Sequence, residues 1–102
     1  MQKMMTKDIL SKAPSMYSTD GQGYEATAVA HYFSCIGGLA GWDWYMTEYD
    51  PDTQEAFGLV LGYEKELGYF SIREFEEINR RYGLNVIERD MYFTPTKLCN
   101  VA

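Results

Sequence analysis

The sequence has no lysine and no arginine between Lys12 and Lys65, although this stretch carries eight of its fifteen carboxylates. The acids and bases outside the stretch nearly cancel, so the formal net charge of −6 is concentrated in the middle of the chain. A concentrated negative field repels nucleic acid and attracts basic surfaces. The pattern therefore argues against direct nucleic-acid binding and favours a protein partner with a positively charged groove, such as one that itself binds DNA or RNA.

Metal-binding residues are also scarce. The chain has two cysteines, Cys35 and Cys99, with no Cys-x-x-Cys pair, and a single histidine, His31, which does not complete a zinc site with them. We therefore predict no metal, no cofactor and two free thiols. On one strand His31 and Cys35 would be about 13 Å apart, too far for direct proton transfer. We interpret His31 as a partly buried structural histidine.

Long apolar runs are missing as well. No segment approaches about 20 consecutive apolar residues, so we expect no membrane-spanning segment. The N-terminus, MQKMMTKDIL, lacks the apolar stretch of a signal peptide, which predicts a cytoplasmic protein. The length of 102 residues fits a single domain over residues 1–102, and an apolar content of 46% is enough for one modest core.

Two segments carry helix signals. Residues 6–13 read as a short N-terminal helix capped by Thr6, with Ile9 and Leu10 facing the core. Residues 71–82 read as the main helix, because Ser-x-x-Glu forms a capping box at its start and a glycine follows its end. Its expected core stripe consists of Ile72, Phe75, Ile78 and Tyr82.

Three segments read as strands, namely residues 26–35, 42–49 and 55–63, and residues 86–93 offer one more short extended segment. An Asp-Pro-Asp-Thr turn joins the second and third strands into a hairpin. Residues 64–71 read as a linker anchored by Leu67 and Phe70. The predicted fold class is α+β, a small antiparallel sheet of three to four strands with one main helix packed on it and a short N-terminal helix.

The strand over residues 42–49 has the strongest pattern. Strict alternation places one set of side chains on each face, and a tryptophan pair on one face is more often core than contact. Gly58 and Gly62 in the next strand indicate a bulge or a close backbone approach. The first expected face holds Trp42, Trp44, Met46 and Glu48, and the second holds Asp43, Tyr45, Thr47 and Tyr49.

Carboxylates between residues 43 and 66 form the candidate contact surface, and Lys65 is the one base among them. Those near the hairpin tip would act as an acidic plug for a basic groove; the alternative is a solvated turn with no specific role. The candidate partner-binding residues are Glu48, Asp50, Asp52 and Glu55 as primary contacts, with Asp43, Glu64 and Glu66 at the rim.

Paired carboxylates also occur in enzymes and in calcium sites. Acid–base catalysis needs a carboxyl group with a raised pKa in a pocket. A calcium loop needs a twelve-residue ligand pattern with a central glycine, and the sequence lacks that pattern. We therefore predict no catalytic residues. An enzyme that uses the carboxylates around Asp50 or Glu64 is kept as an alternative hypothesis.

Five sequence blocks carry a resemblance to a known family. They are TDGQG (19–23), WDWYMTEYDP (42–51), FGLV (57–60), EKELGYFS (64–71) and IERD (87–90). Together they resemble a small domain-of-unknown-function family that is spread across plasmids, phages and other mobile elements. Within that family the chain is similar to a type II-A anti-CRISPR protein, which inhibits an RNA-guided Cas effector nuclease.

The resemblance implies a protein that binds a type II CRISPR effector nuclease in the bacterial host cell. Such nucleases hold nucleic acid in a positively charged channel and read a short flanking motif with arginines. Carboxylates would compete for those arginines through bidentate pairs, as a DNA mimic. The inhibitor would otherwise lock a conformation away from the channel. The first hypothesis is therefore an inhibitor of a type II effector nuclease. The second hypothesis is a generic acidic binding module of a mobile element with a different basic protein partner.

Overall fold

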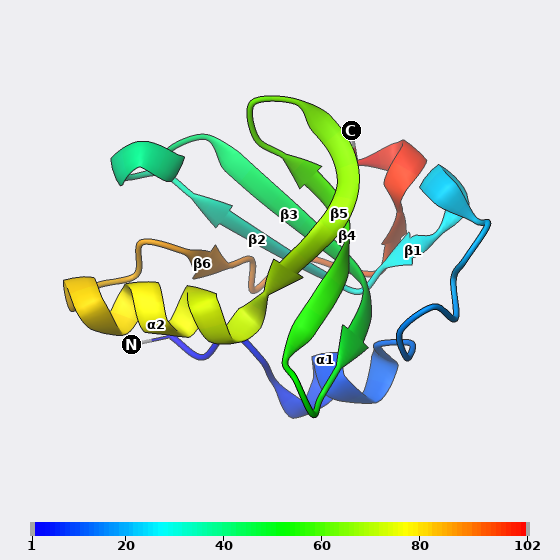
Figure 1. Cartoon of the computed structure of the whole chain (residues 1–102), viewed down its shortest axis with the longest axis horizontal. Coiled ribbons are helices and arrows are strands. Elements are labelled where there is room, and N and C mark those ends of the chain that lie inside the picture. The colour runs from blue at the N-terminus through cyan, green and yellow to red at the C-terminus, as the bar shows by residue number, and fades with distance from the viewer. Residues whose placement is uncertain (1, 102) are drawn as a thin grey trace.

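A five-stranded antiparallel sheet forms the centre of the structure, a computed structural model that describes residues 2–101 (Figure 1). The spatial order of its strands is β5, β4, β3, β2 and β6. The α+β architecture is confirmed, and the sheet is larger than the three to four strands predicted. The strands are β2 Ala30–Ser34, β3 Trp42–Asp50, β4 Glu55–Leu61, β5 Lys65–Ser71 and β6 Glu88–Arg89.

The remaining elements lie around this sheet. The helices are α1 Lys7–Lys12 and α2 Ile72–Tyr82, and the short strands β1 Thr27–Ala28 and β7 Thr96–Lys97 form a separate two-stranded ladder. Three 3-10 helices, η1 Gly23–Glu25, η2 Gly37–Leu39 and η3 Leu98–Asn100, complete the described part. No helix within residues 2–101 is long and apolar enough to cross a membrane.

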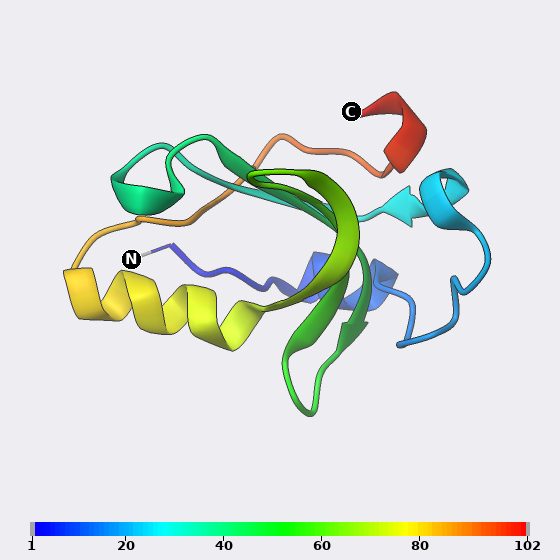
Figure 2. The same ribbon diagram turned by 45° about the horizontal axis from the view of Figure 1, so that its top comes forward.

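Each face of the sheet packs on its own core cluster, and α2 and η3 lie on opposite sides of it (Figure 2). On the α2 side, aromatic rings meet, because Phe75 contacts Trp44 at 4.8 Å and Tyr32 at 5.6 Å between ring centroids. On the other side, Leu59 packs with Leu98 of η3. Both faces of the sheet are therefore largely occupied by the chain itself.

The extra strand is β5. The sequence predicts a linker over residues 64–71, but Lys65–Ser71 pairs with β4 along its whole length. The chain reverses through residues 62–64, where the Gly62 N–H donates to the Glu64 carbonyl at 3.2 Å. The predicted anchors Leu67 and Phe70 both pack in the core. They pack in different clusters, since residues three apart on a strand point to opposite faces.

The main helix begins and ends where the sequence predicts. The Ser71 hydroxyl accepts a hydrogen bond from the Glu74 N–H at 3.1 Å, and Gly83 adopts a left-handed φ of 69°. The expected core stripe holds at Ile72, Phe75 and, half-buried, Ile78, but it is wrong at Tyr82, which is 63% exposed.

Asn79 occupies the buried place at this end of α2 instead. Its side-chain amide donates to the Ile87 carbonyl and accepts from the Ile87 N–H, both at 2.9 Å. The returning chain therefore crosses the helix at Asn79, one turn before Tyr82. At the N-terminal helix, Thr6 caps the Ile9 N–H at 3.1 Å as predicted and Ile9 is buried, whereas Leu10 is exposed and does not face the core.

A β-bulge in β3 changes which side chains face α2. Met46 and Glu48 pair with adjacent residues of β4, which leaves Thr47 as the extra residue. An extra residue reverses the alternation of side chains beyond it. Tyr49, and not Glu48, therefore joins Trp44 and Met46 in the core cluster. The predicted faces are right up to Met46 and wrong for Glu48 and Tyr49.

The close backbone approach predicted at Gly58 is confirmed. A Cβ atom on Gly58 would overlap the carbonyl oxygen of Tyr45, so only glycine fits opposite the bulge. At Gly62 a Cβ would meet the ring of Trp42 at 2.5 Å. The bulge itself lies in β3, whereas the glycines lie in and just after β4.

The other predicted strands are shorter than expected. Residues 26–35 form β1 and β2, with a break at Val29, whose N–H donates to the Met46 carbonyl at 2.8 Å. The extended segment 86–93 forms strand pairs with β2 at Glu88–Arg89, and the Asp90 N–H donates to the His31 carbonyl just beyond them at 2.9 Å. Cys35 and Cys99 are free, as predicted, and both are exposed.

Candidate functional site

The seven candidate contact residues do not form one surface. Strand β4 runs between two turns that lie at opposite ends of the sheet, one over residues 51–54 and one over residues 62–64 (Figure 1). At about 3.3 Å per residue, the seven residues of β4 separate the turns by roughly 20 Å. Asp50, Asp52 and Glu55 lie at the first turn, and Asp43, Glu64 and Glu66 lie at the opposite end.

The first turn carries three carboxylates, Asp50, Asp52 and Glu55, which we call the tip acids. Asp52 and Glu55 are exposed, and Asp50 is half-buried. The Asp50 carboxylate accepts a hydrogen bond from the Asp52 N–H at 2.9 Å, and the Gln54 N–H donates to the Asp50 carbonyl at 2.7 Å. None of the tip acids forms an ion pair with any base in residues 2–101. The charges of Asp52 and Glu55 therefore face solvent, whereas the Asp50 carboxylate also stabilises the turn.

Glu48 is placed differently, because its side chain is buried at 2% exposure. Its carboxylate accepts hydrogen bonds from the N–H groups of Tyr17 and Thr19, at 2.9 and 2.8 Å, and from the Thr19 hydroxyl. These bonds hold the loop before β1 against the sheet. Glu48 is therefore occupied within the chain, and the structure does not bring it to the surface formed by the tip acids.

Asp43 is also bound by a neighbour. It accepts a hydrogen bond from His31 Nε2 at 2.7 Å, while His31 Nδ1 contacts Asp90 at 2.9 Å. The imidazole stacks on Tyr45 with 4.3 Å between ring centroids and is 13% exposed, as expected for a partly buried structural histidine. Because an ionised carboxylate only accepts, each ring nitrogen that carries a proton donates to the carboxylate beside it. The two hydrogen bonds of His31 thus join β2, β3 and the segment after β6.

The pKa of Asp90 reflects this arrangement. Partial burial by itself raises the pKa of this carboxyl group, but the hydrogen bond from His31, the bonds from the Tyr92 and Phe93 N–H groups and the charge of His31 together lower it below its ordinary value. The ionised form of Asp90 is thus favoured in the folded protein. Sequence patterns did not identify Asp90, because it lies 59 residues from His31.

The second turn carries Glu64 and Glu66, both exposed, beside two aromatic rings. The Trp42 and Tyr63 rings meet edge to face at 5.4 Å, and these four side chains line a shallow pocket of about 300 Å³. Of the predicted tryptophan pair, Trp44 is buried and Trp42 half-buried, which matches a core role for Trp44. This turn and the tip acids are two separate acidic surfaces.

No curated protein and no solved structure matches this chain. A family model described as "Protein of unknown function (DUF2958)" matches residues 3–101. Because this match covers nearly the whole sequence, the chain belongs to the DUF2958 family.

Proposed function

We propose that this protein is a non-enzymatic inhibitor that binds an RNA-guided type II Cas effector nuclease, as an anti-CRISPR protein of a phage or another mobile element. It acts in the cytoplasm of the bacterial host. The observation that carries the proposal is the set of tip acids on the β3–β4 turn, of which Asp52 and Glu55 are exposed and none forms an ion pair within residues 2–101. The resemblance of five sequence blocks to a type II-A anti-CRISPR protein gives the partner its identity.

The shape of the hairpin suits insertion into a groove. Two paired strands lie about 5 Å apart, so the turn is narrow, and it projects away from the rest of the molecule (Figure 2). Arginines that read the flanking motif of the target DNA present forked N–H donors, and carboxylates accept these in bidentate pairs. The tip acids would occupy such arginines and exclude DNA. Salt screens the attraction between these carboxylates and the arginines of the nuclease, so inhibition should weaken as ionic strength rises.

The decisive experiment is a DNA-cleavage assay with a type II effector and its guide RNA, with this protein added before the target DNA at low and high salt. The test variant is Asp52→Lys/Glu55→Lys. Its matched control is Glu64→Lys/Glu66→Lys, because all four side chains are exposed and both variants change the net charge equally. Glu48 stays unchanged in both, since its removal would disturb the fold.

We expect the wild type and the Glu64/Glu66 variant to inhibit cleavage and the Asp52/Glu55 variant to lose inhibition. A folded Asp52/Glu55 variant that inhibits as well as the wild type would show that the tip acids are not the contact. Inhibition that ignores salt would move the contact to an apolar surface. No inhibition of several type II effectors by the wild type would reject the nuclease as partner.

The second turn favours another candidate function, a binding module of a mobile element with a different basic protein partner. The rings of Trp42 and Tyr63 beside two carboxylates suit a lysine or arginine side chain, through cation–π contact and charge. Under this hypothesis the roles of the two variants reverse. The Glu64→Lys/Glu66→Lys variant should lose its basic partner, and the Asp52→Lys/Glu55→Lys variant should keep it.

A further inference from the structure

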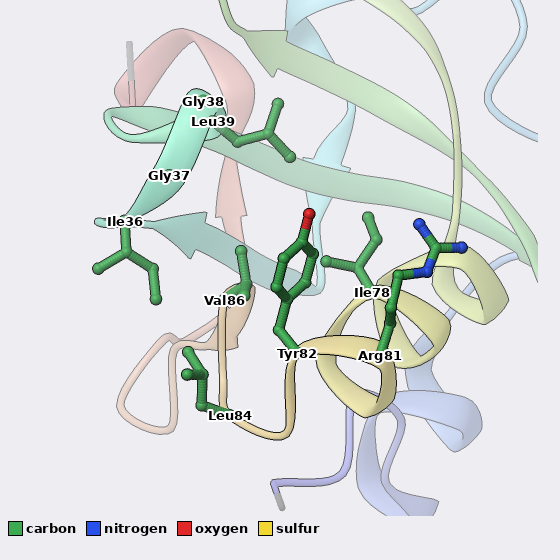
Figure 3. A pocket seen from close by; sticks show the side chains of 9 residues that line it. All are labelled: Ile36, Gly37, Gly38, Leu39, Ile78, Arg81, Tyr82, Leu84 and Val86. Atoms are coloured by element: carbon green, nitrogen blue, oxygen red, sulfur yellow. The ribbon is translucent and has the colours of Figure 1, made fainter.

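An apolar pocket lies between η2 and the C-terminal end of α2 (Figure 3). Its volume is about 430 Å³, within the usual range for small-molecule sites. The pocket contains none of the acidic residues discussed above. The side chains drawn around it come from η2 and the residue before it, from α2, and from the segment that follows α2; they are Ile36, Leu39, Ile78, Arg81, Tyr82, Leu84 and Val86.

The rim of this pocket leaves large apolar side chains in contact with water. Ile36, Tyr82 and Leu84 are all exposed, although each is large and largely apolar. They come from two separate segments and gather at one opening (Figure 3). Gathered apolar side chains at a surface mark a binding site more often than scattered ones do. The packing of the chain itself gives Tyr82 and Leu84 no buried place.

Arg81 gives the pocket its chemical preference. It is the one charged residue among those that line the pocket, and its side chain lies beside Ile78 (Figure 3). No carboxylate in residues 2–101 lies within ion-pair distance of it, although Glu77 precedes it by one helical turn. An unpaired guanidinium beside an apolar wall suits a ligand that combines an alkyl chain with an anionic group.

We propose that this pocket binds a small amphiphilic carboxylic acid with an unbranched alkyl chain. The chain lies between Leu39, Ile78 and Val86, and the carboxylate pairs with Arg81. The carboxylate keeps to the guanidinium and away from the last carbonyl groups of α2, because the C-terminal end of a helix dipole repels anions. The site is independent of the tip acids.

The test is a titration of the full chain with octanoate and with 1-octanol, followed by amide chemical shifts in NMR spectra. We expect shifts at residues 36–39 and 78–86, and tighter binding of octanoate by about fivefold, the size of an exposed ion pair. Arg81→Gln should abolish this preference and leave octanol binding unchanged. Arg80→Gln is the matched control, because it removes the same charge from the next residue, which lines a different pocket.

A chain-length series tests the apolar part. Octanoate should bind about fourfold more tightly than heptanoate, since each buried methylene contributes by that factor. Leu84→Gln, at an exposed position, should weaken the binding of both octanoate and heptanoate without changing the melting temperature of the protein. Three results would overturn the proposal: shifts centred outside the pocket, octanol binding as tightly as octanoate to the wild type, or equal losses of the preference in the Arg80 and Arg81 variants.

Discussion

At the scale of single residues, Glu48 shows that a carboxylate in an acidic segment can serve the fold. Glu48→Ala would leave the part-buried N–H donors of Tyr17 and Thr19 without their carboxylate partner, and each hydrogen bond to a charged group contributes about 1.5–3 kcal/mol. We expect a loss of about 3 kcal/mol in the free energy of unfolding, measured by urea denaturation. Asp52→Ala is the control and should change it by less than about 0.5 kcal/mol. Equal losses would contradict a structural role for Glu48.

Gly58 and Gly68 make a second residue-scale test, because they pair with each other across β4 and β5. Gly58→Ala would drive a Cβ atom into the Tyr45 carbonyl, which should cost at least about 2 kcal/mol. Gly68→Ala meets no atom within 4 Å, so it should be neutral or stabilise by up to about 1 kcal/mol. Thermal unfolding of both variants measures the difference. A Gly58→Ala protein as stable as Gly68→Ala would show that the bulge relaxes freely.

The residue features that sequence predicted are the local ones. Thr6, Ser71 and Gly83 act on backbone groups within three or four residues, and their capping roles are confirmed. Glu48 and His31 find partners 12 to 59 residues away, and no local pattern reports such distances. For this reason the sequence suggested the burial of His31 but not its carboxylate partners.

At the scale of elements, α2 depends on Phe75, whose ring packs against Tyr32, Trp44 and Phe70. Phe75→Ala should lower the free energy of unfolding by about 3–5 kcal/mol, because it leaves a cavity between helix and sheet. Tyr82→Ala, on the same helix, should cost less than about 1 kcal/mol, since that ring is mostly exposed. Denaturant unfolding of both variants checks this. Near-wild-type stability of Phe75→Ala would show that the core stripe is wrong.

Helices were easier to predict than strands for a physical reason. A helix satisfies its own hydrogen bonds, so capping and periodicity are written in one segment. Strand β5 needs β4, and its sequence, KELGYFS, has two charges and a glycine that weaken any local strand signal. The bulge at Thr47 likewise depends on two strands at once. It places Tyr49 in the core cluster on the α2 side and turns Glu48 to the opposite face.

At the scale of the whole molecule, the sequence predicted the amount of negative charge but not its distribution. The fold engages Glu48 and Asp43 with internal donors and divides the rest between two turns at opposite ends of β4. A single acidic strip in sequence is therefore two separate surfaces in space. The proposed inhibition depends on one of them, and the two matched charge-reversal variants separate the contributions.

The molecule as a whole should lose stability in acid through Asp90, which ties the segment after β6 to His31. Its pKa in the folded protein lies below the ordinary value of 3.8, so the ionised carboxylate stabilises the fold above that pH. The contribution disappears as pH falls from that value through the lower folded-state pKa. Asp90→Asn removes the charge at every pH. Urea denaturation should therefore find the variant less stable than the wild type near neutral pH, with a difference that narrows as the pH falls below 3.8; a constant difference would mean that Asp90 titrates alike in both states.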